Sequence, residues 1–217
     1  MKKDEVIRPT SILLNNRSLT RTQRLFLKVY YVIHPASALK MALKWVQPGT
    51  YLHCQHVERI ALAVGATYTK KFHSKINVGN LKHAAFFHDI GKLSIQNDVL
   101  TRKHLTAADR WLIRRHPEVG ALVLRGLFNP SVCAAVLSHH EERNATGYPR
   151  GIGDKKLSLI TEIISTVDDY CAMIERRGYN KPLNPEKAVA QLEHEIGTRY
   201  DERIVSILKA RLSVDPH

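Results

Sequence analysis

The stretch "AAFFHDIGKLSI", residues 84–95, places an acidic side chain inside an otherwise apolar segment. Apolar residues at helical spacing over residues 78–92 predict a helix that ends near Gly91. A carboxylate such as Asp89 is costly to bury unless it is paired or bound to a cation. We therefore expect His88 and Asp89 either to converge on a cation at the helix end or to form a hydrogen-bonded pair in the core.

The same helical periodicity continues on both sides of this stretch, and strand-like alternation is nearly absent. Asn129 and Asn184 are each followed by a proline, which is typical of an N-cap and the first helical position. The expected fold is all-α, a bundle whose helices pack around an interior site. The predicted helices lie within 18–33, 37–46, 50–68, 78–92, 106–128 with a break at His116, 129–142, 157–177, 184–196 and 201–212.

The turn signal "QPGT", residues 47–50, predicts the best domain boundary in the chain. It separates a helical N-terminal extension, residues 1–48, from one larger domain, residues 49–217. Because about 45 residues rarely fold alone, we expect the extension to pack on the domain. Formation of a homodimer and docking of a partner are the alternatives.

The composition indicates a globular protein, since 44% of the residues are apolar. The three cysteines, Cys54, Cys133 and Cys171, are few and far apart, which favours a reducing compartment over a disulfide framework. The basic N-terminus lacks a long apolar segment, and the longest apolar runs elsewhere are interrupted by charge. We expect a cytoplasmic protein that does not insert into a membrane.

The formal net charge is +13, and residues 1–50 carry nine Lys or Arg against two Asp or Glu. Such a charge attracts polyanions in general, including phosphate-rich small ligands, and a solvated basic face is its simplest explanation. No nucleic-acid recognition motif accompanies it, so nucleic acid is not an expected partner.

Histidines and aspartates recur on the helices around the opening stretch. Imidazole and carboxylate ligands suit Fe, Mn, Zn or Ni, and seven of them are about right for two metals. Two metals a few ångströms apart are a common device for phosphoester hydrolysis, and Lys92 could add positive charge for the phosphate. The seven candidate ligands are His56, His88, Asp89, His116, His139, His140 and Asp168.

The remaining histidines have weaker contexts. His53 lies three residues before His56 and could share its helix face, so it is an outside candidate. A surface position is expected for His73, His83, His104 and His194, because no acidic or apolar context singles them out.

Several strings, in order and with fitting spacing from about residue 50 to about residue 205, resemble the HD-GYP subgroup of the HD phosphohydrolase superfamily. They are "HVERIA", "AAFFHDIGKLSI", "HPEVG", "SHHEERNATGYP", "DDYCAM", "RRGY" and "GTRYDERIV". The resemblance implies the seven metal ligands above, with Asp89 bridging two ions. It also implies catalytic roles for Asp89 and Lys92, and contacts to substrate from Lys92, Arg177, Tyr179, Gly147, Tyr148 and Pro149.

The sequence departs from the family pattern at several positions outside the metal ligands. Leu52 stands where some members have a glutamate that helps to bind a third metal, so two metals are expected. Glu142, Arg143 and Asn144 replace Arg, Trp and Asp before the Gly-Tyr-Pro motif. Further departures, in the motifs "DxYDA" and Arg-Pro-Tyr, are Cys171 for Asp, Gly178 for Pro and Asn180 for a basic residue.

The resemblance implies a phosphodiesterase that hydrolyses a cyclic dinucleotide, with cyclic di-GMP opened to pGpG and/or GMP by a hydroxide that two metals activate. Fe or Mn is expected, with Ni, Zn or Mg as alternatives. Because the outer residues are altered, a second hypothesis is a binding module that docks a diguanylate cyclase through residues 147–149. A third is a hydrolase of another phosphoester.

Overall fold

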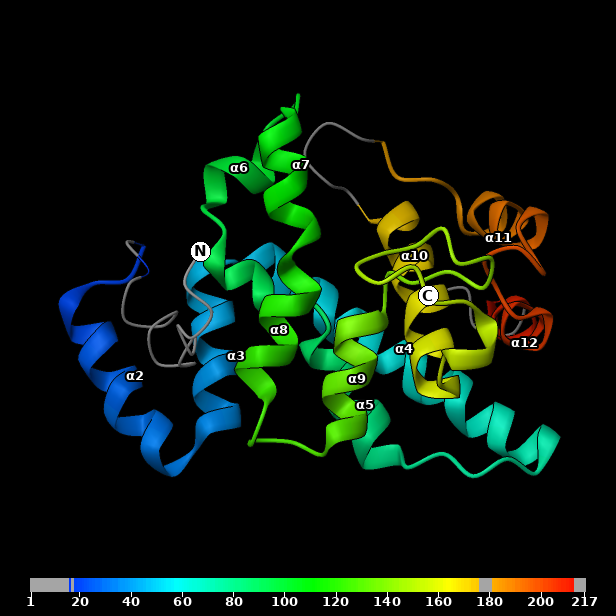
Figure 1. The fold of residues 1–217 in the computed structure, drawn as a ribbon, viewed down its shortest axis with the longest axis horizontal. Helices are drawn as coiled ribbons and strands as arrows, with labels where there is room; N and C mark the ends of the chain where they lie inside the picture. Colours follow the sequence, from blue (N-terminus) through cyan, green and yellow to red (C-terminus); the bar gives the residue numbers. More distant parts are fainter. Residues whose placement is uncertain (1–15, 17, 176–180, 213–217) are drawn as a thin grey trace.

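The computed structural model describes residue 16 and residues 18–175 and 181–212, and within these the chain is helical with no strand. This confirms the all-α prediction. Figure 1 shows α4, α5, α8, α9 and α10 at the centre, α2 and α3 at one end and α11 and α12 at the other. The elements are α2 (Arg21–Ile33), α3 (Pro35–Val46), α4 (Pro48–Phe72), α5 (Val78–Phe87), the 3₁₀ helix η1 (Ile90–Ser94), α6 (Asn97–Thr101), α7 (Ala107–Arg114), α8 (His116–Leu124), α9 (Pro130–Ser138), the 3₁₀ helix η2 (Asp154–Lys156), α10 (Leu159–Ile174), α11 (Pro185–His194) and α12 (Glu202–Leu212).

The predicted asparagine caps are confirmed. The side chain of Asn129 accepts the backbone N–H of Ser131 at the start of α9, and that of Asn184 accepts the N–H of Glu186 at the start of α11. In both helices a proline occupies the first turn, where its missing N–H costs no hydrogen bond. These caps fix where the two helices begin.

Two predicted helix boundaries were wrong. The helix α5 ends at Phe87 rather than near Gly91, and η1 then begins at Ile90. The reason is steric: a Cβ at Gly91 would lie 2.0 Å from the carbonyl oxygen of His116 and 2.7 Å from the amide nitrogen of Gly120. Only a glycine therefore fits where η1 meets α8. At the other boundary, α4 begins at Pro48, so "QPGT" forms the start of a helix rather than a separate turn.

The core surrounds the junction of α5 and η1. Helix α4 packs against α5 and α10, α8 packs against α9 and η1, and α5 also contacts α9. Phe86, Phe87, Ile90 and Leu124 are among the largest fully buried side chains. The helix ends that carry the histidines therefore meet within one packed core. No helix in the part of the chain that the structure describes has the length and apolarity needed to cross a membrane.

The N-terminal helices differ in how they pack. Helix α3 contacts α4 and η1 and buries Leu39 and Leu43, and the Gln47 side chain donates to the carbonyl oxygens of Lys92 (2.7 Å) and Ile95 (3.2 Å). Helix α2 packs on α3. The domain boundary after residue 48 stays a prediction. The exposed apolar side chains of α2 are Leu25, Phe26, Val29, Val32 and Ile33.

The close approach at Gly91 yields a first prediction. Replacing Gly91 with Ala should lower the free energy of unfolding by about 3 kcal/mol, because the new Cβ would overlap backbone atoms that cannot move independently. Urea denaturation followed by circular dichroism measures the change. Gly49→Ala is the matched control, since no atom lies within 4 Å of its Cβ position. Equal stability of the two variants would contradict the steric argument.

Candidate metal centre

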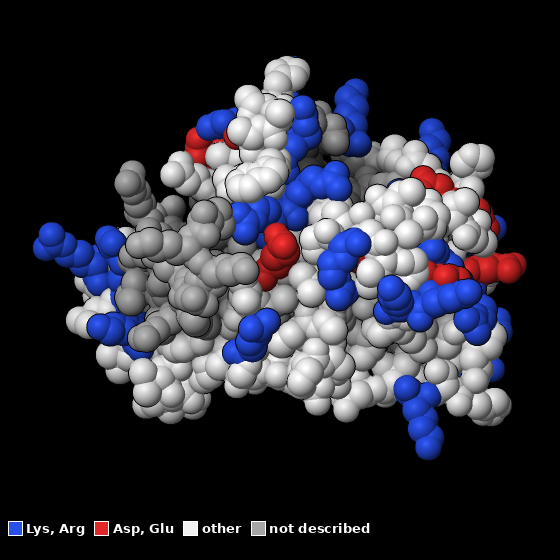
Figure 2. Space-filling view, in the orientation of Figure 1, with Lys and Arg blue, Asp and Glu red and all other residues white. Residues whose placement is uncertain are grey.

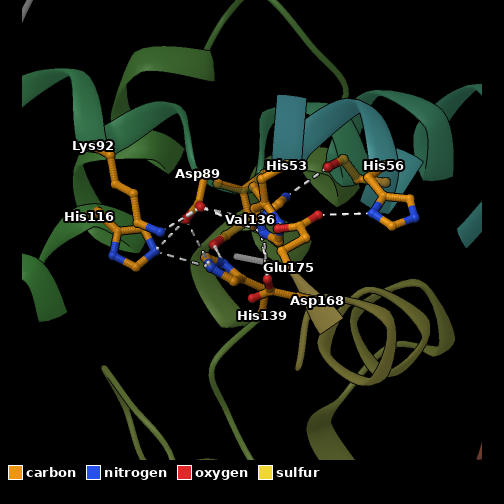
Figure 3. Close-up of polar contacts among 11 residues, drawn as sticks. His53, His56, Asp89, Lys92, His116, Val136, His139, Asp168 and Glu175 are labelled. Carbon is orange, nitrogen blue, oxygen red and sulfur yellow. Dashed lines mark hydrogen bonds and ion pairs between the residues drawn. The ribbon is translucent and has the colours of Figure 1, made fainter. Parts of the chain in front are cut away.

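Two groups of possible metal ligands meet at the ends of the central helices. His53, His88 and Asp89 form one group, in which one ring nitrogen of each histidine and one carboxylate oxygen lie within 4.8 Å of one another. A second group within the same limit contains His116, His139 and His140. Figure 3 shows Asp89 lying between His116 on one side and His53 on the other.

The two carboxylate oxygens of Asp89 face different groups. Its Oδ1 lies 3.1 Å from Nε2 of His116 and 4.0 Å from Nε2 of His139. Its Oδ2 lies 3.5 Å from Nε2 of His88 and 4.0 Å from Nε2 of His53. One carboxylate thus connects both groups, as a bridging ligand would.

Asp89 is a buried charge, with only 1% of its surface exposed. Burial by itself would raise the pKa of this carboxyl, but the ammonium of Lys92 and the imidazoles of His88 and His116 outweigh it and hold the pKa well below its usual range. The Lys92 ammonium lies 2.5 Å from Oδ2. Asp89 is therefore ionised at neutral pH.

Three of the histidines are oriented by backbone carbonyl groups at helix ends. Nδ1 of His88 lies 2.8 Å from the carbonyl oxygen of Ala85, and the corresponding distances are 2.6 Å from His116 to Ile113 and 2.7 Å from His139 to Val136. A carbonyl oxygen can only accept, so each Nδ1 carries the proton. In the neutral imidazole, Nε2 then has a lone pair, which is the tautomer that binds a metal.

Two histidines of the second group, His139 and His140, are held in the neutral form. Burial, together with the neighbouring His116, lowers the pKa of His140 to about 3. Burial and the surrounding histidines also lower the pKa of His139 well below its usual range. These imidazoles are therefore available as ligands at neutral pH, because a protonated imidazole has no lone pair to offer.

The unpartnered atoms of the centre fit metal ions. Nε2 of His116 and Nε2 of His139 lie 3.1 Å apart, although both Nδ1 atoms already hold the proton of the neutral ring. Among the described residues, the buried atoms without a hydrogen-bond partner include Nε2 of His88 and Oδ1 of Asp89. Orphaned buried polar atoms are costly and rare. A divalent cation in each group would satisfy them.

The structure brings six of the seven predicted ligands together and places His56 elsewhere. Asp168 joins the first group, with Oδ1 at 2.8 Å from Nε2 of His53 and 3.7 Å from Nε2 of His88. His53, the outside candidate, thus occupies the position expected for His56. Nδ1 of His56 lies instead 2.9 Å from Oε1 of Glu175. The ligand roles of all seven residues stay predictions.

The Gly-Tyr-Pro segment packs directly on the histidine pair. A Cβ at Gly147 would lie 2.4 Å from the carbonyl oxygen of His140, so only glycine fits. The Tyr148 ring stacks on the His140 ring, with centroids 4.8 Å apart and planes at 27°. Buried Glu141 secures the segment that follows by accepting the backbone N–H groups of Arg150 (2.7 Å) and Ile152 (2.9 Å). Pro149 lies beside Tyr148 at the edge of the centre.

The predicted substrate contacts are only partly visible. Lys92 keeps 17% of its side chain exposed while it contacts Asp89, so its ammonium faces both the centre and solvent. Arg177 and Tyr179 lie outside the described residues. Of the altered residues, Arg143 pairs with Glu162 and lies 3.5 Å from Asp201, contacts that hold the loop against the helices.

Sequence reasoning missed Glu141 and Glu175. Glu175 follows Asp168 by seven residues and Cys171 by four, a spacing that places all three near one face of α10. That spacing was the signal in the sequence that could have identified Glu175. No such spacing pointed to Glu141, because its role depends on a loop that folds back after Pro149.

Comparisons with known proteins show which family the chain resembles in sequence. The family model described as HD domain matches residues 34–204. The chain is 27% identical over 155 residues to the cyclic di-GMP phosphodiesterase of Thermotoga maritima, covering 70% of this chain and 42% of that protein. It is 30% identical over 168 residues to the 3′3′-cGAMP-specific phosphodiesterase 3 of Vibrio cholerae, covering 74% of this chain and 35% of that protein.

The fold is also similar to a solved structure. The HDGYP protein Bd1817 of Bdellovibrio bacteriovorus superposes with a TM-score of 0.62 at 17% identity, over 94% of this chain and 68% of that one. The chain spans less than half the length of the two curated relatives it matches.

The position of Asp89 yields a second prediction. Asp89→Asn should weaken metal binding to both groups, because it removes the one charge that faces both, whereas His140→Ala should weaken binding to the second group alone. Elemental analysis after anaerobic dialysis against Mn²⁺ measures the ions bound per chain. The loss should be about one ion for His140→Ala and larger for Asp89→Asn. Identical losses in the two variants would contradict a bridging role.

Proposed function

The chain belongs to the HD domain family and to its HD-GYP subgroup, and on that premise we propose that it is a metal-dependent phosphodiesterase of cyclic dinucleotides. The observation that carries this proposal is the position of Asp89, whose two oxygens face two separate ligand groups. Such an arrangement supports two neighbouring cations, which suit hydrolysis of a phosphodiester.

Bound divalent ions would supply Lewis acidity and lower the pKa of a water molecule that attacks phosphorus. His88, Asp89, Asp168 and His53 would hold one ion, and Asp89 would share the other with His116, His139 and His140. The ring of the cyclic dinucleotide opens when one phosphorus–oxygen bond breaks and the released ribose oxygen takes up a proton. The product is a linear dinucleotide such as pGpG, and cleavage of its remaining diester would give GMP.

Two side chains beside the centre fit the charge and shape of such a substrate. The ammonium of Lys92 can pair with a phosphate oxygen, as charge-assisted contacts to phosphate are strong. Burial raises the pKa of the Tyr148 phenol well above its usual value, so its hydroxyl remains a hydrogen-bond donor. The Arg114 guanidinium lies 4.3 Å from the centre of the Tyr148 ring and adds positive charge to the same loop.

The substrate class follows from the relatives and from charge. The similar proteins above are named for cyclic di-GMP and for 3′3′-cGAMP, which share a ring of two ribose phosphates. The net charge of +13 favours a dianionic ligand, and Figure 2 shows more Lys and Arg than Asp and Glu side chains on one face of the molecule. We take cyclic di-GMP as the substrate and 3′3′-cGAMP as the first alternative substrate to test.

The donor set favours Fe or Mn as the resident ions. Five imidazoles and two carboxylates make a mixed nitrogen and oxygen environment that suits borderline divalent metals. Ni, Zn and Mg are alternatives to be compared in the same assay.

A second candidate function is a binding module that holds a cyclic dinucleotide without turnover and docks a diguanylate cyclase through residues 147–149. The exposure of Asn144, Ala145 and Thr146 favours it, because these residues lie directly before the motif. Calorimetry that detects nucleotide binding without hydrolysis would support this second function. Formation of a homodimer, the alternative raised by the N-terminal extension, is tested separately by light scattering.

The proposal predicts that metal-loaded protein opens cyclic di-GMP. Incubation with Fe²⁺, Mn²⁺, Ni²⁺ or Mg²⁺ under reducing conditions, followed by chromatography, should yield a linear dinucleotide. His88→Ala and Asp89→Ala should each lower the rate by roughly 100-fold or more while helical circular dichroism persists. Exposed His104 provides the matched control, and His104→Ala should keep the wild-type rate.

Three results would count against the proposal. Failure to open cyclic di-GMP, 3′3′-cGAMP and cyclic di-AMP with every metal would refute the enzymatic activity. Cleavage of a simple chromogenic phosphoester but of no cyclic dinucleotide would point to a different substrate. Wild-type rates in His88→Ala would refute the location of the site.

A further inference from the structure

A third group of ligand-type side chains lies outside the centre, between α4 and α10. It consists of His56, Cys171 and Glu175, and one nitrogen, sulfur and oxygen atom from these residues lie within 4.8 Å of one another. Figure 3 shows His56 turned away from Asp89, with Glu175 between them. The proposed function above assigns none of these three residues a role in hydrolysis.

The helices hold these side chains in place before any ligand binds. Cys171 lies on α10, and Glu175, the C-cap residue of that helix, follows it by four residues, so both face the same way. His56 lies on α4, which packs against α10. Cys171 is buried, whereas His56 and Glu175 keep 26% and 22% of their side chains exposed. An ion could therefore enter from solvent and reach a sulfur atom at the bottom of the group.

The chemistry of the three donors defines the kind of ion that would fit. A thiolate, an imidazole and a carboxylate together suit zinc and other borderline divalent cations and do not suit magnesium or calcium. Tetrahedral zinc, with bonds of about 2.0–2.3 Å, places its ligand atoms roughly 3.3–3.8 Å apart. Nδ1 of His56 and Oε1 of Glu175 lie 2.9 Å apart, so only small shifts are needed.

The group is connected to the centre through a single carboxylate. Oε2 of Glu175 lies 2.8 Å from Nδ1 of His53, and Nε2 of the same ring lies 2.8 Å from Oδ1 of Asp168. An ion that fixes Glu175 would keep it as the acceptor for the Nδ1 proton of His53. The Nε2 lone pair of His53 would then point into the centre, as in metal sites where a carboxylate orients a ligating histidine.

His56 supplies an imidazole from α4. Glu175 supplies a carboxylate from a different helix, and Cys171 supplies sulfur. We propose that His56, Cys171 and Glu175 bind a further divalent cation of the zinc class, with a fourth coordination position open to water. This site is separate from the two groups joined by Asp89 and does not depend on the proposed hydrolytic function.

Cobalt provides a direct test, because Co²⁺ bound to a thiolate absorbs in the near ultraviolet and Co²⁺ bound only to nitrogen and oxygen does not. Full-length protein is stripped with a chelator under reducing conditions and titrated with Co²⁺. We expect the thiolate band in the wild type. Cys171→Ser should abolish the band and lower the bound cobalt by about one ion per chain.

Matched variants identify the sulfur and the neighbouring ligands. Cys133→Ser is the control, because Cys133 belongs to none of the three groups, and it should keep the full band. His56→Ala, at a partly exposed position, should weaken cobalt binding at this site even if Cys171→Ser folds poorly. Helical circular dichroism is measured for every variant.

The cobalt titration and the hydrolysis assay test this third group and the centre independently. His140→Ala, which disturbs the centre, should leave the thiolate band unchanged. A wild-type protein that shows the band but hydrolyses no cyclic dinucleotide would refute the enzyme and leave this site standing. Absence of the band in the wild type would overturn the site. A band that survives Cys171→Ser but disappears in Cys54→Ser would also overturn it, since the sulfur would then come from a different helix face.

Discussion

The burial of one ionised carboxylate organises this structure. Asp89 is almost fully enclosed, and such a charge is tolerated only where opposite charge or hydrogen-bond donors surround it. Lys92 supplies one positive charge from the next turn of chain. The remaining contacts are imidazoles from other helices, among them His116 on α8 and His139 at the end of α9. Gly91 permits α8 to pack on η1, and this packing brings His116 to Asp89. The close approach of the two elements therefore helps to stabilise the buried charge.

Helix ends provide the second part of this arrangement. The last carbonyl groups of a helix lack partners within it, and a side chain that follows the helix can donate to them. His88 follows α5 and His139 follows α9, and each ring turns its Nδ1 toward a carbonyl group in the last turn of that helix. His116 bonds a carbonyl group of α7 in the same way. Backbone groups that would otherwise be unsatisfied thus select the tautomer and the direction of three imidazole rings, without any dedicated side chain.

The sequence predicted where the helices lie and which residue types gather at the centre. It predicted less well which individual side chains point into that centre. Periodicity and the caps at Asn129 and Asn184 were sufficient because they depend on local interactions. The choice between His53 and His56 was not local. Both residues lie near one face of α4, one turn apart, and only the position of α10 decides which of them meets Asp168.

The end of α5 was mispredicted for a related reason. Nothing in residues 88–92 forbids a further helical turn by itself, and the obstacle is the backbone of α8, which is distant in sequence. Glu175 escaped attention because a glutamate near a helix end is usually solvated. Its contacts with two histidines of α4 appear only after the two helices are packed. Long-range packing, which single-sequence patterns do not encode, accounts for each of these differences.

The ionised carboxylates of the centre are suited to holding divalent cations. Asp89 and Asp168 are ionised, since nearby imidazoles, together with Lys92 in the case of Asp89, hold their pKa values well below the usual range despite burial. His139 and His140 are neutral at physiological pH, and the ammonium of Lys92 lies 2.5 Å from Asp89. A ligand that approaches the centre thus meets two buried carboxylates, although the molecule as a whole is strongly basic. Divalent cations held by these carboxylates would add positive charge at the centre, of the same sign as the overall field.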